Sequence, residues 1–489
     1  MSFVVKKSLS LTLKLYLAAI MNSSETESFS FPAAPARIFL VGIGGIGMSA
    51  LAQLLVHLGY QVAGSDRGLK DPDKQDLYEK LARQGIALFP QDGSGIVRFR
   101  PDCLIHSAAI EAGNPDFLAA EGIPLLHRAS ALAQCLNRIP AIQVAVAGSC
   151  GKTSVTGWLS SALRCLGHRI LMVNGGYCNN FENATLPGNF FADENPEFLL
   201  VEVDESDRSI REFSPDYAIL LNIGNDHYST DELQQVFAGF LQKTRRGAVL
   251  PAELQSLPPE QLPVSFFSEQ ATAGNSAYPE NYQATPEGCQ FQIHGFKEAV
   301  CCRQNGLHSA WNAAAILQML AMLLPEKRDC LPGSLNEFRG VRQRFELVSE
   351  PGDACPRIND YAHNPEKIAA ALATARERFG SPLLALFQPH GFAPFGFMRG
   401  ALKEVLRTAL HPGDQLILLP VYYAGGSSSH SPTSQEVAQE YQAAGLPVLA
   451  ADNRAQAEQM VRDYPRKTCI LVMGARDASL RNWTRTLQA

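Results

Sequence analysis

The amino-acid sequence predicts an α/β protein of three domains, each built on a largely parallel sheet. Short apolar runs alternate along the chain with longer helix-like segments, which is the arrangement of βαβ units. Two of these runs, residues 37–41 and 142–147, end in glycine-rich turns that lead directly into a helix-like segment. The chain has 489 residues. Because that is too long for a single hydrophobic core, about three domains are expected.

The composition describes a soluble globular protein. Hydrophobic residues make up 46% and charged residues 18% of the chain. The net charge of −6 gives no general affinity for nucleic acid or for an anionic membrane, so any phosphate site must be local. The 11 cysteines show neither a CxxC pair nor the spacing of a zinc site, and they fit reduced thiols in a cytoplasm.

The first 36 residues are expected to lie outside the fold. Two lysines precede a mostly apolar run, residues 9–21, which resembles a weak signal peptide. A disordered leader, or a true start at Met21, explains the segment equally well. A membrane-spanning helix is not expected, because about 20 apolar residues are needed.

The first folded segment carries a dinucleotide-type fingerprint. The strand at residues 37–41 runs into Gly42-Ile43-Gly44-Gly45-Ile46-Gly47, a helix follows over 48–59, and a second strand over 61–64 leads to Asp66. This arrangement predicts a diphosphate at the helix N-terminus and a ribose near Asp66. A dinucleotide and a nucleotide-sugar diphosphate meet these needs equally, and an ordinary packing turn is the remaining alternative.

The second glycine turn predicts a site for the phosphates of a nucleotide. The apolar run 142–147 enters Gly148-Ser149-Cys150-Gly151-Lys152-Thr153-Ser154, and residues 155–166 read as a helix. Backbone N–H groups and the helix dipole favour negative charge at such a point. Lys152 is expected to reach the terminal phosphates and the Thr153 hydroxyl to bind magnesium. A plain strand–turn–helix corner would explain the glycines but not the Lys-Thr pair.

Acidic side chains follow the next buried strand, at residues 198–201. Glu202 and Asp204 alternate with valines, so both carboxylates can point to one side, although an acidic loop is the plainer alternative. A further strand over 217–223 leads to Asn225-Asp226-His227. The carboxyl end of a parallel strand beside a phosphate loop suits a magnesium ligand, so Glu202 and His227 are candidates for a metal or phosphate role.

The rest of the chain carries weaker signals. No chemistry is evident in residues 250–302, and Asn312, in a helix over 309–324, is expected to face solvent. Closely spaced arginines, including Arg344, mark a junction and suit a phosphate clamp or a solvated linker. A third α/β unit follows, with strands at 357–360, 383–387, 415–419 and 469–472 and a helix at 367–378.

The motifs in series resemble those of the Mur ligases, the ATP-dependent amide-forming enzymes of peptidoglycan synthesis, over residues 38–477. No single motif is specific, but their order is. The series comprises Gly42 to Met48, Ser107 to Ile110, Gly148 to Thr153, Glu202 to Asp207, Asp226-His227 and Asp360-Tyr361-Ala362-His363-Asn364-Pro365.

The resemblance implies a Rossmann-like UDP-sugar domain over 37–138, a central P-loop ATPase domain over 139–337 and a Rossmann-like amino-acid-binding domain over 338–489. It implies ATP and Mg2+ as cofactors, and UDP-N-acetylmuramate and a small amino acid, by default L-alanine, as substrates. The carboxylate would be phosphorylated by ATP and the resulting acyl phosphate attacked by the amine. The enzyme would be a cytoplasmic monomer or homodimer, bound to neither nucleic acid nor membrane.

The resemblance also implies roles for individual residues. Lys152, Glu202, His227 and His363 would be catalytic, and Thr153, Glu202 and His227 would hold magnesium. Three sets would bind substrates: Gly148, Ser149, Cys150, Gly151, Lys152, Thr153, Ser154, His308, Asn312, Arg344 and Asp360 for ATP; Gly44, Gly45, Ile46, Asp66, Ser107, Arg128 and Asn183 for the UDP-sugar; Tyr361, His363 and His390 for the amino acid.

Departures from the family pattern concentrate at the amino-acid end. Cys150 replaces a usual His, and Ser309 a usual Asn. Gly391 and Pro394 stand where two arginines are usual, and Pro420 and Gly426 where acids are usual. Another amino acid or peptide as acceptor, or a non-catalytic UDP-sugar binder, is therefore an alternative. An NAD-dependent oxidoreductase would leave Lys152, Thr153 and Glu202 unexplained.

Overall fold

The computed structural model describes residues 30–205, 209–224, 230–271, 274, 276–350, 352–423, 430–465 and 467–488. The chain forms two compact units. One contains the described residues up to Val144 together with Arg169–Gly175 and Phe181–Pro215, and the other contains Ala145–His168, Gly176–Asn180 and the chain from Asp216 onward. None of the helices within these described ranges is long and apolar enough to cross a membrane.

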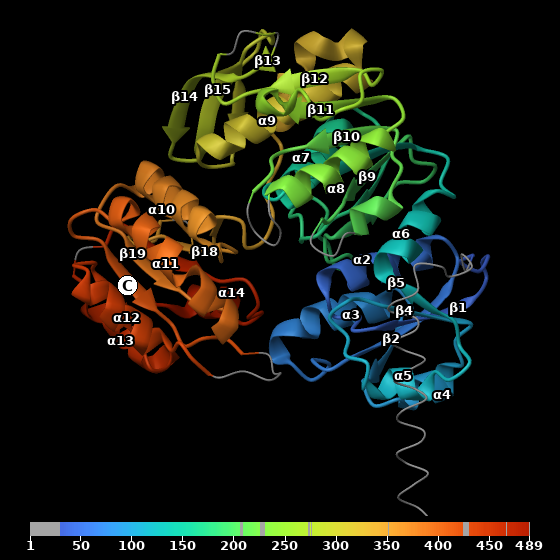
Figure 1. Cartoon of the computed structure of the whole chain (residues 1–489), viewed down its shortest axis with the longest axis horizontal. Helices are drawn as coiled ribbons and strands as arrows, with labels where there is room; N and C mark the ends of the chain where they lie inside the picture. Colours follow the sequence, from blue (N-terminus) through green and yellow to red (C-terminus); the bar gives the residue numbers. More distant parts are fainter. Residues whose placement is uncertain are drawn as a thin grey trace, which may run out of the picture. The chain divides into compact units, whose positions relative to one another are not determined.

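The first sheet is a five-stranded parallel sheet in the order β3-β2-β1-β4-β5 (Figure 1). Alternate residues of the central strand β1 face opposite sides, and Phe39 and Val41 pack with α4 and the segment after α5. The elements are β1 (Arg37–Val41), α2 (Ile46–His57), β2 (Gln61–Asp66), α3 (Gln75–Arg83), β3 (Ala87–Pro90), α4 (Ser94–Phe99), β4 (Cys103–His106), α5 (Pro115–Ala119), β5 (Leu125–His127) and α6 (Arg128–Leu136).

The expectation that all of residues 1–36 lie outside the fold is wrong for residues 31–36. The Phe31 side chain is only 2% exposed and its ring lies 5.4 Å from that of Tyr60. Phe31 N donates to Gln134 Oε1 at 2.8 Å, and the Arg138 guanidinium lies over the Phe31 ring. The local sequence around Phe31 is rich in Ser and Pro. It therefore gave no sign that the Phe31 ring would be buried against Tyr60 and Arg138.

The second sheet has eight strands in the order β13-β12-β11-β10-β6-β9-β7-β8. The β7–β9 pair and the β10 to β13 pairs are parallel, and β8 is antiparallel to β7. The elements are β6 (Ile142–Ala147), α7 (Lys152–Cys165), β7 (Ile170–Val173), β8 (Phe190–Ala192), β9 (Phe198–Glu202), β10 (Tyr217–Leu220), α8 (Thr230–Gln242), β11 (Gly247–Pro251), β12 (Val264–Phe267), β13 (Ser276–Ala277) and α9 (Leu307–Leu323).

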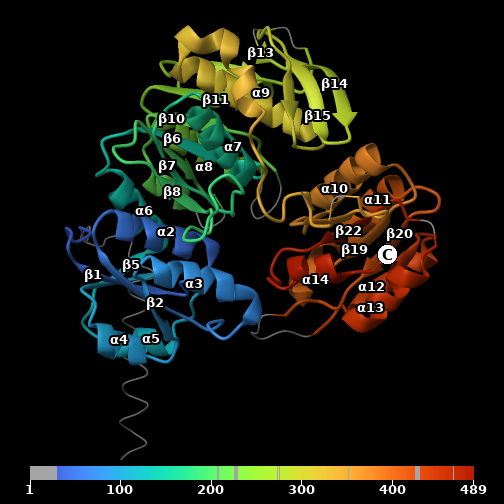
Figure 2. The same ribbon diagram turned by 180° about the vertical axis from the view of Figure 1, so that it is seen from behind.

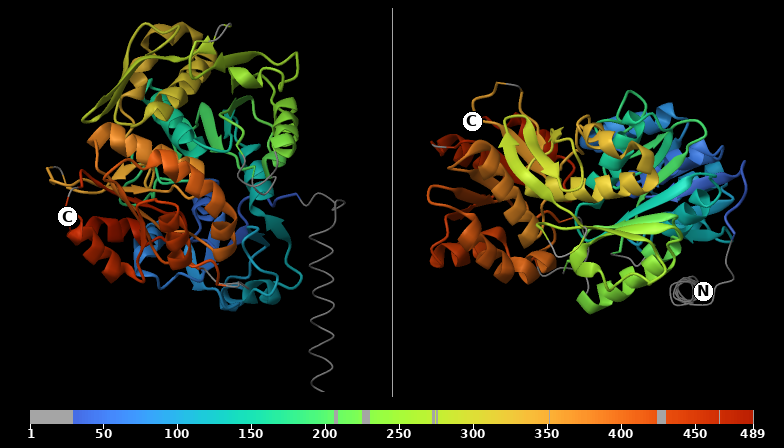
Figure 3. Two further views of the ribbon diagram at one scale, coloured as in Figure 1. Left: turned by 60° about the vertical axis from the view of Figure 1, so that its left-hand side comes forward. Right: turned by 90° about the horizontal axis from the view of Figure 1, so that it is seen from above.

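A small antiparallel sheet follows β13 and appears as yellow arrows in Figure 3. It consists of β14 (Pro279–Thr285), β15 (Gly288–Ile293) and β16 (Val300–Cys302). In this sheet Cys289 lies opposite Cys302. The chain leaves β16 directly into the residues that precede α9.

The last sheet has six strands in the order β17-β18-β22-β19-β20-β21, and helices cover both of its faces (Figure 2). Ala385 and Phe387 of β19 pack with α10, α11 and α12, whereas Leu384 and Leu386 pack with α13 and α14. The elements are β17 (Glu346–Leu347), β18 (Arg357–Asp360), α10 (Pro365–Phe379), β19 (Leu384–Phe387), α11 (Phe392–Ala409), β20 (Gln415–Leu418), α12 (Ser434–Ala443), β21 (Val448–Ala450), α13 (Arg454–Asp463), β22 (Ile470–Met473) and α14 (Leu480–Thr486).

The predicted elements exist, and their ends differ by a few residues. The helix expected over 155–166 begins at Lys152, because Gly151 forms its N-cap with a positive φ of 87°. The helix expected over 48–59 likewise begins earlier, at Ile46. The domain boundaries expected at residues 138 and 337 stay predictions.

Candidate active site

The phosphate loop lies between β6 and α7, in the second unit. Gly148 and Gly151 both have a positive φ, of 132° and 87°. A Cβ on Gly148 would lie 3.1 Å from the Asn222 nitrogen, and one on Gly151 would lie 3.1 Å from Asn312 Oδ1. Glycine is therefore required at both positions by backbone conformation and by the close approach of neighbours. The turn directs the first N–H groups of α7 toward one point, as an anion site requires.

Asn222, just beyond β10, holds this loop in place. Its Oδ1 accepts a hydrogen bond from Cys150 N at 2.8 Å, and its Nδ2 donates to Cys150 O at 3.1 Å. Its main-chain oxygen accepts from Ser149 N at 3.2 Å. The Ser149 hydroxyl in turn accepts from Gly224 N at 2.9 Å. The sequence signal for Asn222 was only its place at the end of a buried strand.

Lys152 is the first residue of α7, and its ammonium donates to Gly148 O at 2.6 Å. The side chain thus folds back over the loop that is predicted to cradle phosphates. Thr153, in the first turn, is buried, and a Cβ on Gly176 would come within 2.6 Å of its methyl group.

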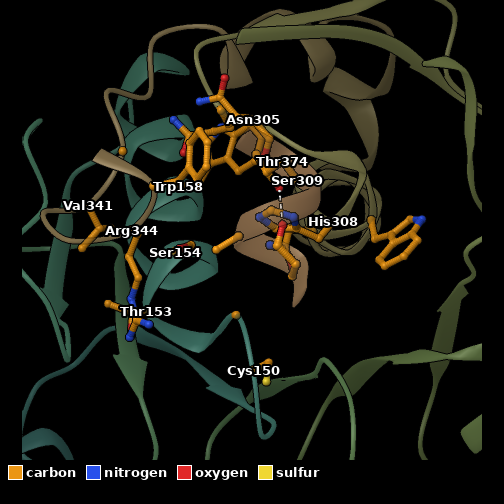
Figure 4. Close-up of a pocket in the computed structure, with 18 of the residues that line it drawn as sticks. Cys150, Thr153, Ser154, Trp158, Asn305, His308, Ser309, Val341, Arg344 and Thr374 are labelled. Atoms are coloured by element: carbon orange, nitrogen blue, oxygen red, sulfur yellow. Dashed lines mark hydrogen bonds between the residues drawn. The ribbon is translucent and has the colours of Figure 1, made fainter. Parts of the chain in front are cut away.

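The loop opens onto a cavity of about 690 Å³ in the second unit. Figure 4 shows Cys150 on the loop, Thr153, Ser154 and Trp158 on α7, and His308 and Ser309 on α9 around this space. Of the residues predicted to bind ATP, eight line it: Cys150, Gly151, Thr153, Ser154, His308, Asn312, Arg344 and Asp360. A cavity of this size suits a nucleotide.

The cavity lining also contains residues that were not predicted. Trp158 is 1% exposed, stacks on Phe338 at 5.6 Å between ring centroids and donates its Nε1–H to Leu335 O at 2.9 Å. Segment 250–302, in which no chemistry was expected, contributes Phe267 and Glu269 to the lining. Only tertiary packing brings Phe338 and segment 250–302 beside α7.

The N-terminal turn of α9 supplies further polar groups to the cavity. The expectation that Asn312 faces solvent is wrong, because its side chain lies against Gly151. Ser309, in place of the usual Asn, is buried and donates to Asn305 O at 2.7 Å. The His308 ring opens onto the cavity, and desolvation there lowers its pKa to about 4, so the imidazole is neutral near pH 7.

Asp360 and Arg344 lie where the last sheet meets the cavity. The Asp360 carboxylate accepts from Phe345 N at 2.6 Å and from Ala362 N at 2.7 Å. Burial raises the pKa of Asp360, while Arg344 and the two N–H donors oppose that shift. The Arg344 guanidinium lies over the Tyr361 ring, 4.7 Å from its centroid. Arg344 therefore lines the cavity, whereas its neighbour Tyr361 lies outside the lining.

The predicted amino-acid end brings three aromatic side chains together. The Tyr361 and His363 rings meet edge to face at 5.5 Å, as do the His363 and His390 rings. His363 Nδ1 lies 2.9 Å from Tyr361 O. Burial, followed by the charge of Arg476, lowers the pKa of His390.

Gly391 and Pro394 both belong to the N-terminal end of α11. Gly391 is the N-cap of α11 with φ 72°, a conformation that an arginine adopts only with strain. Pro394 occupies the third helical position, where its missing N–H has no intrahelical partner to lose. The helix start is therefore built around residues that cannot provide a cationic clamp.

The predicted UDP-sugar residues lie in the first unit. A Cβ on Gly47 would lie 2.6 Å from Arg128 Nη1, so the arginine covers the glycine turn. Asp66, expected beside a ribose, accepts from Gly44 N at 2.8 Å, Gly68 N at 2.7 Å and Tyr78 OH at 3.0 Å. Its carboxylate shapes the turn that contains Gly44, Gly45 and Ile46.

The two remaining residues of that set lie on loops of the same unit. Ser107 directly follows β4, and its carbonyl accepts from Ile110 N at 3.2 Å. Asn183 lies in a turn, where its Oδ1 accepts from Thr185 N at 2.8 Å and Leu186 N at 2.9 Å. Arg83 Nη1 donates to the neighbouring Ala184 O at 2.6 Å, which places this turn beside α3.

Glu202, at the end of β9, belongs to the first unit and Thr153 to the second. The Glu202 carboxylate accepts from Gly175 N at 2.7 Å. His227 and Gly426 lie outside the described residues. Within the residues that the structure describes, no group of three or more His, Cys, Asp or Glu side chains is placed to hold a metal ion.

Three family models match consecutive segments of the chain. They describe the Mur ligase family catalytic domain at residues 37–139, the Mur ligase middle domain at 146–320 and the Mur ligase glutamate ligase domain at 343–476.

Similar proteins cover nearly the whole chain. The UDP-N-acetylmuramate–L-alanine ligase of Coxiella burnetii is 32% identical over 92% of both chains, and that of Myxococcus xanthus is 31% identical over 84% of this chain and 85% of its own. The crystal structure of UDP-N-acetylmuramate-alanine ligase MurC from Thermotoga maritima superposes with a TM-score of 0.74 at 25% identity, over 92% of this chain and 98% of that chain.

A murein peptide ligase from Psychrobacter arcticus, at 18% identity, shares the fold with a TM-score of 0.66, over 92% of this chain and 97% of that chain. The ordered motifs, the three matched domain models and the long alignments agree on one assignment: the chain is a member of the Mur ligase family.

Proposed function

We propose that this chain is an ATP-dependent ligase of peptidoglycan precursor synthesis, which joins L-alanine to UDP-N-acetylmuramate in the cytoplasm. The observation that carries the proposal is the likeness to the ligase of Coxiella burnetii over 92% of both chains. The nucleotide-sized cavity beside the phosphate loop supports it.

The reaction requires a carboxylate to attack a phosphate that is itself negatively charged. The carboxylate oxygen displaces ADP from the terminal phosphate of ATP and forms an acyl phosphate. The amine of the amino acid then attacks the acyl carbon, and phosphate leaves with that oxygen. Repulsion between the two anions is the main barrier, so positive charge and N–H donors at the transferred phosphate are the chief catalytic requirement.

Residues of the second unit could meet this requirement. The N–H groups at the start of α7 and the Lys152 ammonium would face the terminal phosphates, and Asn222, which bonds the Cys150 peptide, would keep the loop in the conformation seen here. The Lys152 ammonium, which donates to Gly148 O in the structure, would turn to the phosphate oxygens when ATP binds.

The Thr153 hydroxyl and the Glu202 carboxylate are oxygen ligands of the kind that Mg2+ prefers, with His227 as a further candidate. The donor chemistry of Thr153 and Glu202 therefore fits this ion. Magnesium held by ligands of this kind would neutralise phosphate charge as a Lewis acid.

A second candidate function is a ligase of the same type with another amino acid or a peptide as acceptor. The specific observation is the start of α11, where Gly391 has φ 72° and Pro394 follows it in the first turn. This end of the site is built without the usual arginines, so the choice of acceptor can differ while the activation of the carboxylate stays the same.

The test is mass spectrometry of products formed from UDP-N-acetylmuramate, ATP, magnesium and a mixture of amino acids. The proposal predicts a product heavier by one alanine residue, with ADP and phosphate in equal amounts, and no product from Lys152→Ala. Preferential addition of another amino acid would establish the second candidate. Absence of any adduct and of ATP consumption would exclude both, and binding of the UDP-sugar without ATP consumption would identify a non-catalytic relative.

A further inference from the structure

Three adjacent parallel strands of the last sheet end side by side. The order β18-β22-β19 places Met473 opposite Asp360 on one side and Phe387 on the other. Gly474 N donates to Asp360 O at 3.0 Å, and Gln388 N donates to Met473 O at 2.9 Å. The loops that follow these strands therefore start from one edge of the sheet.

These loops contain the predicted amino-acid-binding side chains and one cation. Residues 361–365 contribute Tyr361 and His363, residues 388–391 contribute His390, and residues 474–477 contribute Arg476, which is the one lysine or arginine among these three segments. The His363 and His390 rings are in contact at 5.5 Å. The charge of Arg476 lowers the pKa of His390, so it acts at this cluster.

Arg476 is exposed, and among the described residues it makes neither a hydrogen bond nor an ion pair. The carboxylates of the same edge are already engaged. Asp477 accepts from Arg454 Nη2 at 2.7 Å and from the Ser479 hydroxyl at 2.5 Å. Asp360 accepts from two backbone N–H groups. The guanidinium is therefore available to an anion that comes from outside the protein.

An amino acid acceptor brings such an anion. Its ammonium group must lose a proton before it can attack the acyl phosphate, so the carboxylate charge is unbalanced at the moment of attack. Tyr361 and His390, whose pKa is lowered, can donate hydrogen bonds to that group but cannot neutralise it. A planar guanidinium is the side chain best matched to a carboxylate, because it can donate two parallel hydrogen bonds.

We propose that Arg476 binds the α-carboxylate of the amino acid acceptor and positions its amine beside His363 and His390. This inference rests on the proposed function and deepens it, because it names a free amino acid or peptide carboxylate as the group that the site selects. Arg476 replaces, from the loop after β22, a cation that the start of α11 does not provide.

The experiment measures KM for each substrate in Arg476→Ala and Arg476→Lys, by phosphate release with the best amino acid of the panel. For Arg476→Ala, KM for the amino acid should rise by about tenfold or more, the loss expected for one charge-assisted hydrogen bond. KM for ATP and for the UDP-sugar should stay unchanged, and Arg476→Lys should restore part of the affinity. Arg407→Ala, an exposed arginine on α11 paired with Glu404, is the matched control.

The amide of the same amino acid, which has no carboxylate charge, provides a second readout. The wild-type enzyme should prefer the acid strongly, and Arg476→Ala should lose that preference. An unchanged KM in Arg476→Ala, or a wild-type enzyme that uses acid and amide equally, would overturn this inference and leave the proposed function intact. If the wild-type enzyme forms no product with any amino acid, the proposed function fails, and this inference fails with it.

Discussion

The side chain of Asn222 is predicted to set the affinity of the enzyme for ATP. It makes two hydrogen bonds to the Cys150 peptide, at 2.8 and 3.1 Å, across 72 residues of sequence. Replacement of Asn222 by alanine removes both bonds without touching Lys152 or Thr153. The phosphate loop then loses the contact that fixes the direction of its N–H groups.

The magnitude follows from the hydrogen bonds that are lost. Each contributes about 0.5–1.5 kcal/mol net, so the two together contribute about 1–3 kcal/mol. If that energy is expressed in nucleotide binding, KM for ATP rises about 5- to 150-fold, at tenfold for each 1.4 kcal/mol. Asn222→Asp should lose more, because a carboxylate would face the Cys150 carbonyl and add negative charge beside the phosphates.

The assay is steady-state phosphate release with ATP varied and both other substrates saturating. Asn453→Ala is the matched control, since Asn453 also bonds a backbone N–H, Gln456 N at 2.9 Å, but caps α13 in the last sheet's outer layer. KM for ATP should rise in Asn222→Ala alone. An ATP KM within about twofold of wild type in Asn222→Ala would refute the role assigned to this clamp.

Three further outcomes are expected. ATP should slow alkylation of Cys150, the half-buried thiol of the phosphate loop, while exposed Cys165 and Cys330 react as before. Peptide mass spectrometry would measure the three rates. An equal alkylation rate of Cys150 with and without ATP would contradict the placement of ATP. Because the folded-state pKa of His308 lies at about 4, below its ordinary value, the unfolded chain binds more protons as pH falls from about 6.5 to 4, and stability is lost across that window. Urea unfolding at about pH 7 and pH 5 should show a smaller loss for His308→Gln, and an equal loss would exclude this effect. Asp66→Ala should lower the free energy of unfolding by about 2–4 kcal/mol, because the carboxylate accepts three hydrogen bonds. Tyr78→Phe should lower it by about 1 kcal/mol, because the hydroxyl donates only one of them. Equal losses for the two variants in thermal or urea unfolding would contradict this role of Asp66.

Local signals were sufficient for the parts of the site that one segment builds alone. The strand β6, the loop from Gly148 to Ser154 and the helix α7 follow one another along the chain. Their conformation depends on glycines at positive φ and on a helix N-terminus. The turn after β1 is of the same kind. Such features are encoded within about ten residues, and the sequence predicts them directly.

Contacts between distant segments could not be predicted in this way. Asn222 reaches Cys150, and Trp158 stacks on Phe338, only because the sheet order and the packing of α7 bring them together. The same reason explains the wrong expectation for Asn312. A polar residue in a helix is most often exposed, and nothing nearby in the sequence indicates that Gly151 lies opposite it.

Asp66 shows a different limit. Its position about 20 residues after the glycine turn predicts a ribose contact, but the carboxylate bonds Gly44 N, Gly68 N and Tyr78 OH. The spacing identifies the turn correctly and leaves open whether the acid serves a ligand or the turn itself. The buried Phe31 is similar, because its partners Tyr60 and Gln134 are far away along the chain.

Oxygen transfer tests the central claim, activation of a carboxylate as an acyl phosphate, most directly. UDP-N-acetylmuramate labelled with ¹⁸O in its carboxylate would be incubated with ATP, magnesium, L-alanine and the enzyme, and the released phosphate analysed by mass spectrometry. The account predicts one labelled oxygen in each phosphate, formed only when all three substrates are present. Phosphate that carries no label while amide accumulates would contradict it.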